Sequence, residues 1–256
     1  MYKSFTTEEW KKLLGLPEDY RVDGMLCYGT WDKDKQVTIF KNALEQLGEH
    51  YEYGELPNFL SKLLEFNIEG KRYWFDVSYG GALLSEYLHL ASIFGSKQNI
   101  LLGTCGGLSP EISGLDIIIP SYSYGNESPT RMYNPKAVDN KHYSDEKLST
   151  SLKGRISSEY KIWQGGTTTC QAMLAETWED VQNWSKEGYI GVEMEAATVF
   201  AVSNYFSVPS AAVLIVGDNL IQGETIGSES FQANREKREL IVKEQYRVAL
   251  AELLNQ

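Results

Sequence analysis

The sequence predicts an α/β fold in which a mostly parallel central sheet is covered by helices on both faces. Short apolar runs typical of buried strands alternate along the chain with segments of helical periodicity. No repeat, low-complexity segment or linker interrupts the 256 residues, so we expect a single domain over residues 1–256. Hydrophobic residues make up 42% and charged residues 23%, which is typical of a globular protein with a substantial core.

The charge of the chain restricts its partners. The formal net charge is −11, which disfavours nucleic acid and anionic membranes as partners because no basic face is available to bind them. The start of the sequence is too polar for a signal peptide, and no apolar run approaches the ~20 residues of a membrane span. We therefore expect a cytoplasmic protein. Its three cysteines have no metal-binding spacing and are expected to be buried free thiols, and we expect no metal and no cofactor.

Periodicity and capping signals predict the elements of the first half of the chain. Thr6 and Glu9 fit a capping box at the start of a short helix that ends at Gly15. A buried strand is expected over 22–29 and a helix over 33–48. Two strands joined by a hairpin at Glu69 and Gly70 follow, and then an amphipathic helix over 82–95.

The second half continues the alternation. A buried strand over 99–108 is expected to run into a glycine turn, and a strand over 115–120 to end at Pro120. The polar residues 121–150 are expected to form a long functional loop. Helices are expected over 148–157, 176–188, 194–206 and 229–254, and strands over 160–168 and 211–219.

Three segments at predicted strand ends carry polar or glycine-rich sequence: residues 103–107 (GTCGG), 193–195 (EME) and 217–219 (GDN). In parallel sheets, ligands bind beyond the carboxyl ends of the strands. Glycines allow backbone N–H groups to approach an anion or a sugar, although a tight turn is an alternative interpretation. Asp218 directly follows an apolar strand, where partial burial favours a general acid, with a turn cap as the alternative. Glu193 and Glu195 are ligand groups or the solvated start of a helix.

These segments together resemble the purine nucleoside phosphorylase and uridine phosphorylase family. "GVEMEAATVF" (191–200) is similar to the Val-Glu-Met-Glu-Ala-Ala stretch of that family. "LLGTCGGLSPEISGLDIIIP" (101–120), "SYGGALLSEYLHL" (78–90) and "VGDN" (216–219) extend the likeness over residues 22–220. The resemblance implies a three-layer α/β/α sandwich with a mixed, mostly parallel and partly closed sheet. It also implies a homo-oligomer, either a dimer or a hexamer.

The resemblance implies cleavage of the N-glycosidic bond of a nucleoside, and it assigns roles to matching residues. Glu195 would accept hydrogen bonds from the 2′- and 3′-hydroxyls of ribose, Met194 would pack under the sugar, and Glu193 would shape the site beside it. Thr104 would contact the incoming phosphate or the sugar. Asp218 would protonate N7 of a purine, or donate a hydrogen bond to it, as the bond breaks.

The base-binding positions favour a purine. The position of the base-stacking aromatic residue of the family is Met173. The Gln and Arg with which uridine phosphorylases bind uracil correspond to Thr177 and Glu179, which do not reproduce them. Asp218 is typical of the purine branch, in which a serine usually precedes it; here the preceding residue is Gly217.

The acceptor positions depart from the family pattern. Leu101 replaces a phosphate-binding Arg, and Gly29 begins "GTWDKDK", in which Lys33 is the nearest cation to the position of a second Arg. Asp32 and Asp34 bracket the position of a Glu that activates water in the nucleosidase branch. The first hypothesis is phosphorolysis of a purine nucleoside with phosphate as co-substrate. Hydrolysis is the alternative, and a nucleoside-binding relative without turnover is a further one.

Overall fold

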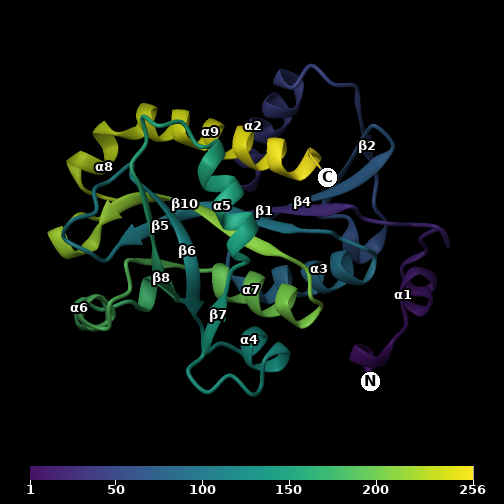
Figure 1. Ribbon diagram of the computed structural model, residues 1–256, viewed down its shortest axis with the longest axis horizontal. Coiled ribbons are helices and arrows are strands. Elements are labelled where there is room, and N and C mark those ends of the chain that lie inside the picture. Colours follow the sequence, from purple (N-terminus) through teal and green to yellow (C-terminus); the bar gives the residue numbers. More distant parts are fainter. Residues whose placement is uncertain (256) are drawn as a thin grey trace.

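The architecture is built on a mixed sheet that the protein forms from strands spread over most of its length. The computed structural model describes residues 1–255. In these residues ten strands form one sheet of order β10-β6-β8-β9-β5-β1-β4-β3-β2, with β7 paired to β6 (Figure 1). The strands are β1 (Gly24–Gly29), β2 (Tyr51–Gly54), β3 (Leu64–Ile68), β4 (Lys71–Ser78), β5 (Asn99–Gly107), β6 (Ile117–Tyr124), β7 (Lys141–Tyr143), β8 (Ile162–Thr169), β9 (Gly191–Glu193) and β10 (Ser210–Asn219).

The sheet closes on itself at one end. β10 pairs with β6 in antiparallel and with β5 in parallel orientation. β5, β9, β8, β6 and β10 therefore form a closed circuit of pairings, and β1, β4, β3 and β2 extend from β5 as an open wing. The predicted mixed and partly closed sheet is confirmed.

Helices cover both faces of this sheet, so the predicted three-layer arrangement is also confirmed. One hydrophobic cluster lies under α2, α5 and α9, and a second lies under α1, α3 and α7. Figure 1 shows α2 and α9 on one side of the sheet and α3 and α7 on the other. The helices are α1 (Thr7–Leu14), α2 (Lys33–Gln46), α3 (Gly81–Ile93), α4 (Ser128–Tyr133), α5 (Glu146–Arg155), α6 (Trp178–Lys186), α7 (Ala196–Tyr205), α8 (Glu229–Ala233) and α9 (Arg235–Leu254). Among residues 1–255 no helix is both long and apolar enough to cross a membrane.

Elements specified by neighbouring residues form where the sequence predicts them. Thr6 caps α1 with the reciprocal bonds to Glu9 of a capping box, and Gly15 ends the helix in the left-handed region with φ 74°. The β3–β4 hairpin turns at Glu69 and Gly70, both of which have positive φ. Local side-chain and turn chemistry accounts for these boundaries.

Predictions fail where a non-local strand pairing decides the structure. The glycine segment 103–107 is not a turn but the end of β5, because β10 pairs with it through Gly107 and β9 pairs with Gly106 and Gly107. Pro120 does not end β6, which continues to Tyr124 past a register shift between Pro120 and Tyr122.

Residues 121–150 do not form one long loop either. They contain the end of β6, α4, β7 and the start of α5. The helix predicted over 229–254 is two helices, α8 and α9, with a break at Asn234. The short strands β2 and β9 were not predicted from the sequence; β9 places Glu193 at a strand end directly before α7.

Candidate active site

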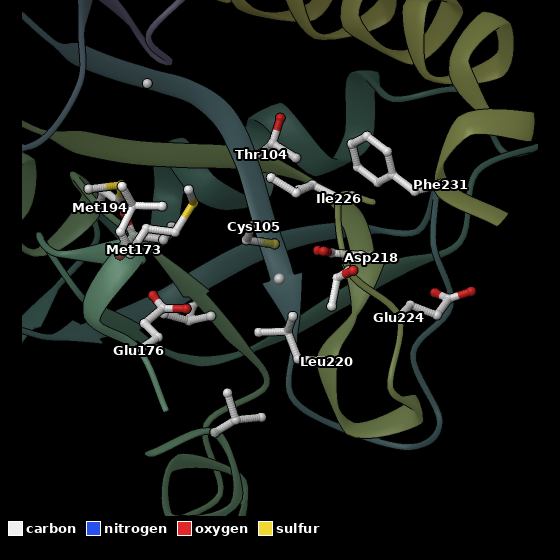
Figure 2. A pocket seen from close by; sticks show the side chains of 18 of the residues that line it. Thr104, Cys105, Met173, Glu176, Met194, Asp218, Leu220, Glu224, Ile226 and Phe231 are labelled. Atoms are coloured by element: carbon white, nitrogen blue, oxygen red, sulfur yellow. The ribbon is translucent and has the colours of Figure 1, made fainter. Parts of the chain in front are cut away.

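The three predicted strand ends meet at one cavity of about 760 Å³. It opens where β1, β5, β9 and β10 end, beside the first turn of α7. Figure 2 shows Met173, Met194 and Glu176 on one side of it, with Asp218 and Phe231 on the other. The predicted site residues that line it are Gly29, Thr104, Met173, Glu193, Met194, Glu195 and Asp218.

Both carboxylate oxygens of Glu193 accept two hydrogen bonds each. Its side chain is 3% exposed. One carboxylate oxygen accepts from the hydroxyls of Thr169 and Ser123, and the other accepts from the backbone N–H groups of Glu195 and Ala196. The last two donors lie at the start of α7, where backbone N–H groups have no partner within the helix. Glu193 therefore supplies the hydrogen-bond acceptor that these two groups need. These four hydrogen bonds link β9 to β6, β8 and the first turn of α7 and leave Glu193 few acceptor positions for a ligand.

Glu195 has fewer partners and is available to a ligand. Its side chain is 5% exposed, and Oε1 accepts from the backbone N–H of Gly80 at 2.7 Å. Burial raises the pKa of Glu195 to about 8, and the neighbouring Glu193 carboxyl adds to this effect. A ligand that donates two hydrogen bonds would compensate for this burial. The geometry therefore suits a diol held against Glu195.

Asp218 lies at the end of β10, where the register of its pairing with β5 shifts between Val216 and Asp218. The irregularity brings the carboxyl into the cavity (Figure 2). Asp218 is 8% exposed. Burial, with the nearby Glu224 carboxyl, raises the pKa of Asp218 to about 6 against the opposing effect of the Arg238 guanidinium. Such a group exchanges a proton near neutral pH, as a general acid requires.

Arg238 connects Asp218 to the C-terminal helices. Its guanidinium lies 3.7 Å from the ring centroid of Phe231 and donates through Nη2 to the backbone carbonyl of Phe231 at 2.9 Å. Its Nη1 is buried and has no hydrogen-bond partner. Arg238 and Phe231 thereby form the wall of the cavity beside Asp218. Neither residue was predicted, because the sequence between 219 and 238 carries no motif that assigns it to the site.

Gly217 departs from the family pattern for a steric reason. A Cβ at this position would lie 2.9 Å from Cγ2 of Thr104 and 3.4 Å from the Phe231 ring. The Thr104 side chain from β5 and the Phe231 ring from α8 fill the space in which a serine would stand. Thr104 on β5 therefore lies close to Gly217, the residue before Asp218 on the paired strand β10.

Glu176 is a further acidic group in the cavity, and it was not predicted from the sequence. It follows the short turn Met173–Ala175 and faces the cavity from the side opposite Asp218 (Figure 2). Burial raises its pKa, and the negative charge of Asp218 contributes. The sequence placed Glu176 at the start of a helix, whereas Thr177 caps α6 and leaves Glu176 outside it. No local signal distinguishes this side chain from a surface acid.

Two acceptor positions lie apart from the cavity. Leu101 is fully buried in the hydrophobic cluster under α3 and α7. Lys33 does not line the 760 Å³ cavity; it lines a second one of about 350 Å³, where its Nζ donates to the backbone carbonyl of Lys62 at 2.5 Å. Tyr79 borders both cavities. In residues 1–255 no group of His, Cys, Asp or Glu side chains is arranged to hold a metal ion.

Known proteins resemble this chain over most of its length. A family model described as the phosphorylase superfamily matches residues 82–254. A purine nucleoside phosphorylase (DeoD-type) of Clostridium beijerinckii is 27% identical over 194 residues, covering 68% of this chain and 79% of that protein. A guanosine phosphorylase of Halorubrum lacusprofundi is 28% identical over 157 residues, covering 61% of this chain and 64% of that protein.

A solved structure of uridine phosphorylase from Vibrio fischeri, in complex with 6-hydroxy-1-naphthoic acid, has the same fold. It superimposes with a TM-score of 0.68 at 15% identity and covers 94% of this chain and 93% of that one. The closed mixed sheet and its strand-end cavity thus define an α/β protein of the phosphorylase type. Since the family model spans more than half of the sequence, the chain belongs to the phosphorylase superfamily.

Proposed function

We propose that the protein cleaves the N-glycosidic bond of a purine nucleoside and transfers the ribosyl group to inorganic phosphate. One observation carries the proposal: Asp218 and Glu195, buried carboxyl groups from separate elements, line the same cavity. Relatives that are named purine nucleoside phosphorylase and guanosine phosphorylase support this choice.

The reaction needs an acid on the base and a negative charge near the sugar. Cleavage passes through an oxocarbenium-like ribosyl cation, as in glycoside hydrolysis. A purine leaves as a poor anion unless it is protonated, and Asp218 would supply the proton at N7. A positioned acid of this kind contributes ~10²–10⁴-fold to the rate. Glu195 would bind the ribose hydroxyls and place negative charge beside the developing cation.

The walls of the cavity support a purine as the base. Met173 and Phe231 offer apolar surface on opposite sides (Figure 2). Glu176 offers a carboxyl group to the N–H groups at the edge of the base. Thr177, at the position where uridine phosphorylases carry a uracil-binding residue, bonds to Asp180 in the capping box of α6. Glu176→Gln is expected to change the ratio of kcat/KM for guanosine over adenosine, and an unchanged ratio would remove Glu176 from base recognition.

Hydrolysis is the second candidate, and the position of Leu101 favours it. Its side chain belongs to the core, so β5 supplies no cation to a phosphate there. Gly29 and Thr104 border the cavity and Lys33 lies beside it, so phosphate would contact backbone, a hydroxyl and at most one side-chain cation. A binding protein without turnover is the third candidate; a general acid at N7 has no purpose in such a protein.

A product assay separates the three candidates. The protein is incubated with inosine, guanosine, adenosine and uridine, each with and without phosphate, and the free base and the sugar product are quantified. We expect purine bases and ribose 1-phosphate when phosphate is present. Base release without phosphate indicates a nucleosidase, and binding without release indicates a binding protein. Faster cleavage of uridine than of any purine nucleoside would contradict the proposed specificity.

We also propose that the protein forms a homo-oligomer, either a dimer or a hexamer, as the resemblance to nucleoside phosphorylases implies. Light scattering coupled to size exclusion measures the mass directly. The chain has a mass of 29.0 kDa, and a species of that mass at micromolar concentration would contradict this proposal.

A further inference from the structure

A buried glutamine of α9 binds three neighbouring strands of the sheet. Gln245 is 1% exposed, and its Nε2 donates to the backbone carbonyls of Gly103 on β5 and Val213 on β10, at 2.9 and 2.7 Å. Its Oε1 accepts from the hydroxyl of Tyr28 on β1 at 3.3 Å. Gly103 directly precedes Thr104, which lines the large cavity, so this buried amide lies next to the proposed acceptor position.

The partners of Gln245 fix the orientation of its amide group. Carbonyl oxygens can only accept hydrogen bonds, so the NH₂ group of Gln245 has to face Gly103 and Val213. The amide oxygen then faces Tyr28, and this oxygen can only accept as well. Tyr28 therefore has to use its single hydroxyl hydrogen to donate to Gln245.

The oxygen of Tyr28 in turn receives the hydrogen of Thr104. The two side chains form a hydrogen bond, and the register allows it: Tyr28 pairs with Leu102, and Thr104 lies two residues further along β5 on the same face. Because the hydrogen of Tyr28 is committed to Gln245, Thr104 has to be the donor. Burial raises the pKa of Tyr28, whereas the hydrogen bonds with Thr104 and Gln36 lower it, as donors to its oxygen do.

Thr104 is left with only its oxygen lone pairs for a ligand. The residue is exposed where it lines the large cavity, and its hydroxyl points away from Asp218 (Figure 2). A group that binds to these lone pairs has to bring its own hydrogen. A fully ionised anion has none, and its oxygens would meet the lone pairs as like charges. An anion that still carries a proton can donate it to Thr104.

The scarcity of cations around Thr104 agrees with such an anion. Leu101, at the position of a family arginine, lies in the hydrophobic core, and Lys33 lines the second cavity. Among residues 1–255, Arg238 is the only basic side chain that lines the large cavity, and its charge interacts with Asp218. Because burying charge without a counter-charge is costly, an anion that keeps a proton enters this cavity at lower cost than one that has lost it.

We propose that Gln245 and Tyr28 fix the direction of the Thr104 hydroxyl, so that the acceptor position binds an anion that carries a proton and discriminates against one that is fully ionised. The inference rests on the proposed phosphorolysis, in which phosphate is the acceptor. At neutral pH phosphate keeps at least one proton, whereas sulfate, which has the same shape, keeps none. Gln245 and Tyr28 are positioning residues, since they act on the ligand only through Thr104.

Isothermal titration of the protein with phosphate and with sulfate measures this discrimination directly. The wild type is expected to bind sulfate about tenfold more weakly than phosphate, the difference that one hydrogen bond to a charged group makes. Tyr28→Phe removes the acceptor of the Thr104 hydrogen, which can then turn toward the ligand and donate to sulfate. The ratio of the two dissociation constants should therefore approach one in this variant.

Tyr246→Phe is the matched control for Tyr28→Phe. Tyr246 is also buried and stacks on Tyr28, but it donates its hydroxyl to Gln36. Its replacement removes a neighbouring buried hydroxyl and should keep the wild-type ratio.

Two further variants keep the test decisive where Tyr28→Phe folds poorly. Gln245→Met removes the acceptor of the Tyr28 hydrogen, which can then turn to Thr104, so it should also bring the ratio toward one. Thr104→Val keeps the shape of the side chain and removes the hydroxyl. It should weaken phosphate binding about tenfold without improving sulfate binding.

Other outcomes would overturn the inference. These are equal binding of the two anions by the wild type, binding of neither, a wild-type ratio in Tyr28→Phe, or the same change of ratio in Tyr246→Phe. Release of base from inosine that depends on phosphate, together with equal binding of both anions, would leave the proposed function in place and remove the inference. Release at the same rate with and without phosphate would contradict the proposed phosphorolysis, and the titration would still decide whether the site discriminates.

Discussion

Gly29 and Glu195 fit together so closely that no side chain can stand between them. A Cβ on Gly29 would lie 2.3 Å from Oε2 of Glu195, well inside contact distance. The end of β1 therefore determines where the carboxylate at the start of α7 can lie. Glycine is required here by the close approach of a side chain, since no positive φ is recorded at this position.

Gly29→Ala should displace Glu195 and weaken its contact with ribose. We expect at least a tenfold loss of kcat/KM on purine ribonucleosides, the equivalent of about 1.4 kcal/mol of transition-state stabilisation. Steady-state kinetics and a thermal melt measure activity and folding separately. Gly154→Ala, at an exposed position of α5 where a Cβ would have no atom within 4 Å, is the control for a general effect of adding a methyl group to a glycine. Full activity in a folded Gly29→Ala protein would show that the position of Glu195 is not critical.

Glu195→Gln should make the protein more stable and less active. The folded-state pKa of Glu195, about 8, lies above the ordinary value of 4.5, so its ionisation opposes folding as the pH rises from 4.5 to 8. The variant should therefore melt at a higher temperature than the wild type at pH 8, with a smaller difference at pH 5. Calorimetry at the two pH values measures this. A lower melting temperature at pH 8 would mean that the carboxylate stabilises the fold.

The same variant tests the diol contact. Glutamine accepts fewer hydrogen bonds than a carboxylate, so the loss of kcat/KM should be larger for inosine than for 2′-deoxyinosine. Equal losses on both substrates would place Glu195 away from the 2′-hydroxyl.

Glu193→Gln should destabilise the fold. The carboxylate accepts four hydrogen bonds, two of them from the start of α7, and the amide NH₂ of glutamine would face donors. An unsatisfied buried donor or acceptor costs about 1–3 kcal/mol. Urea unfolding measures the change in the free energy of unfolding. A stability equal to that of the wild type would mean that α7 does not depend on this cap.

The activity of the wild type should decline as the pH rises through the pKa of Asp218. The proposed acid works only when protonated, and its pKa in the free protein is about 6, so kcat/KM should fall up to tenfold per pH unit above that value. Arg238→Met removes a positive charge that lowers this pKa and should move the decline to higher pH. Glu224→Gln removes a negative charge that raises it and should move the decline to lower pH. Shifts of the same sign in both variants would contradict the assignment.

Where neighbouring residues specify an element, the sequence was sufficient to predict it. The cap at Thr6 and the hairpin at Glu69 and Gly70 depend on contacts within a few residues. The extension of β6 past Pro120 depends instead on β8, which pairs with Pro120 from more than forty residues away. Periodicity within a window of the sequence carries no information about such a partner.

The residues of the candidate site also fall into two groups: those that a local motif predicts and those that only the folded structure identifies. Glu195 and Asp218 stand in recognisable motifs at strand ends, and both line the large cavity. Glu176 lines the same cavity from the turn after β8, and Arg238 lines it from α9. These two residues are far apart in the sequence and come together only in the folded structure.

The role of Asp218 as the acid is tested most directly with a substrate that needs no acid. Inosine requires a proton at N7 before the base leaves, whereas 7-methylinosine already carries a positive charge on its base. The measurement is kcat/KM of the wild type and of Asp218→Asn on both nucleosides. We predict a loss of about 10²-fold or more on inosine and a much smaller loss on 7-methylinosine. An equal loss on both substrates, or undiminished cleavage of inosine, would contradict the account.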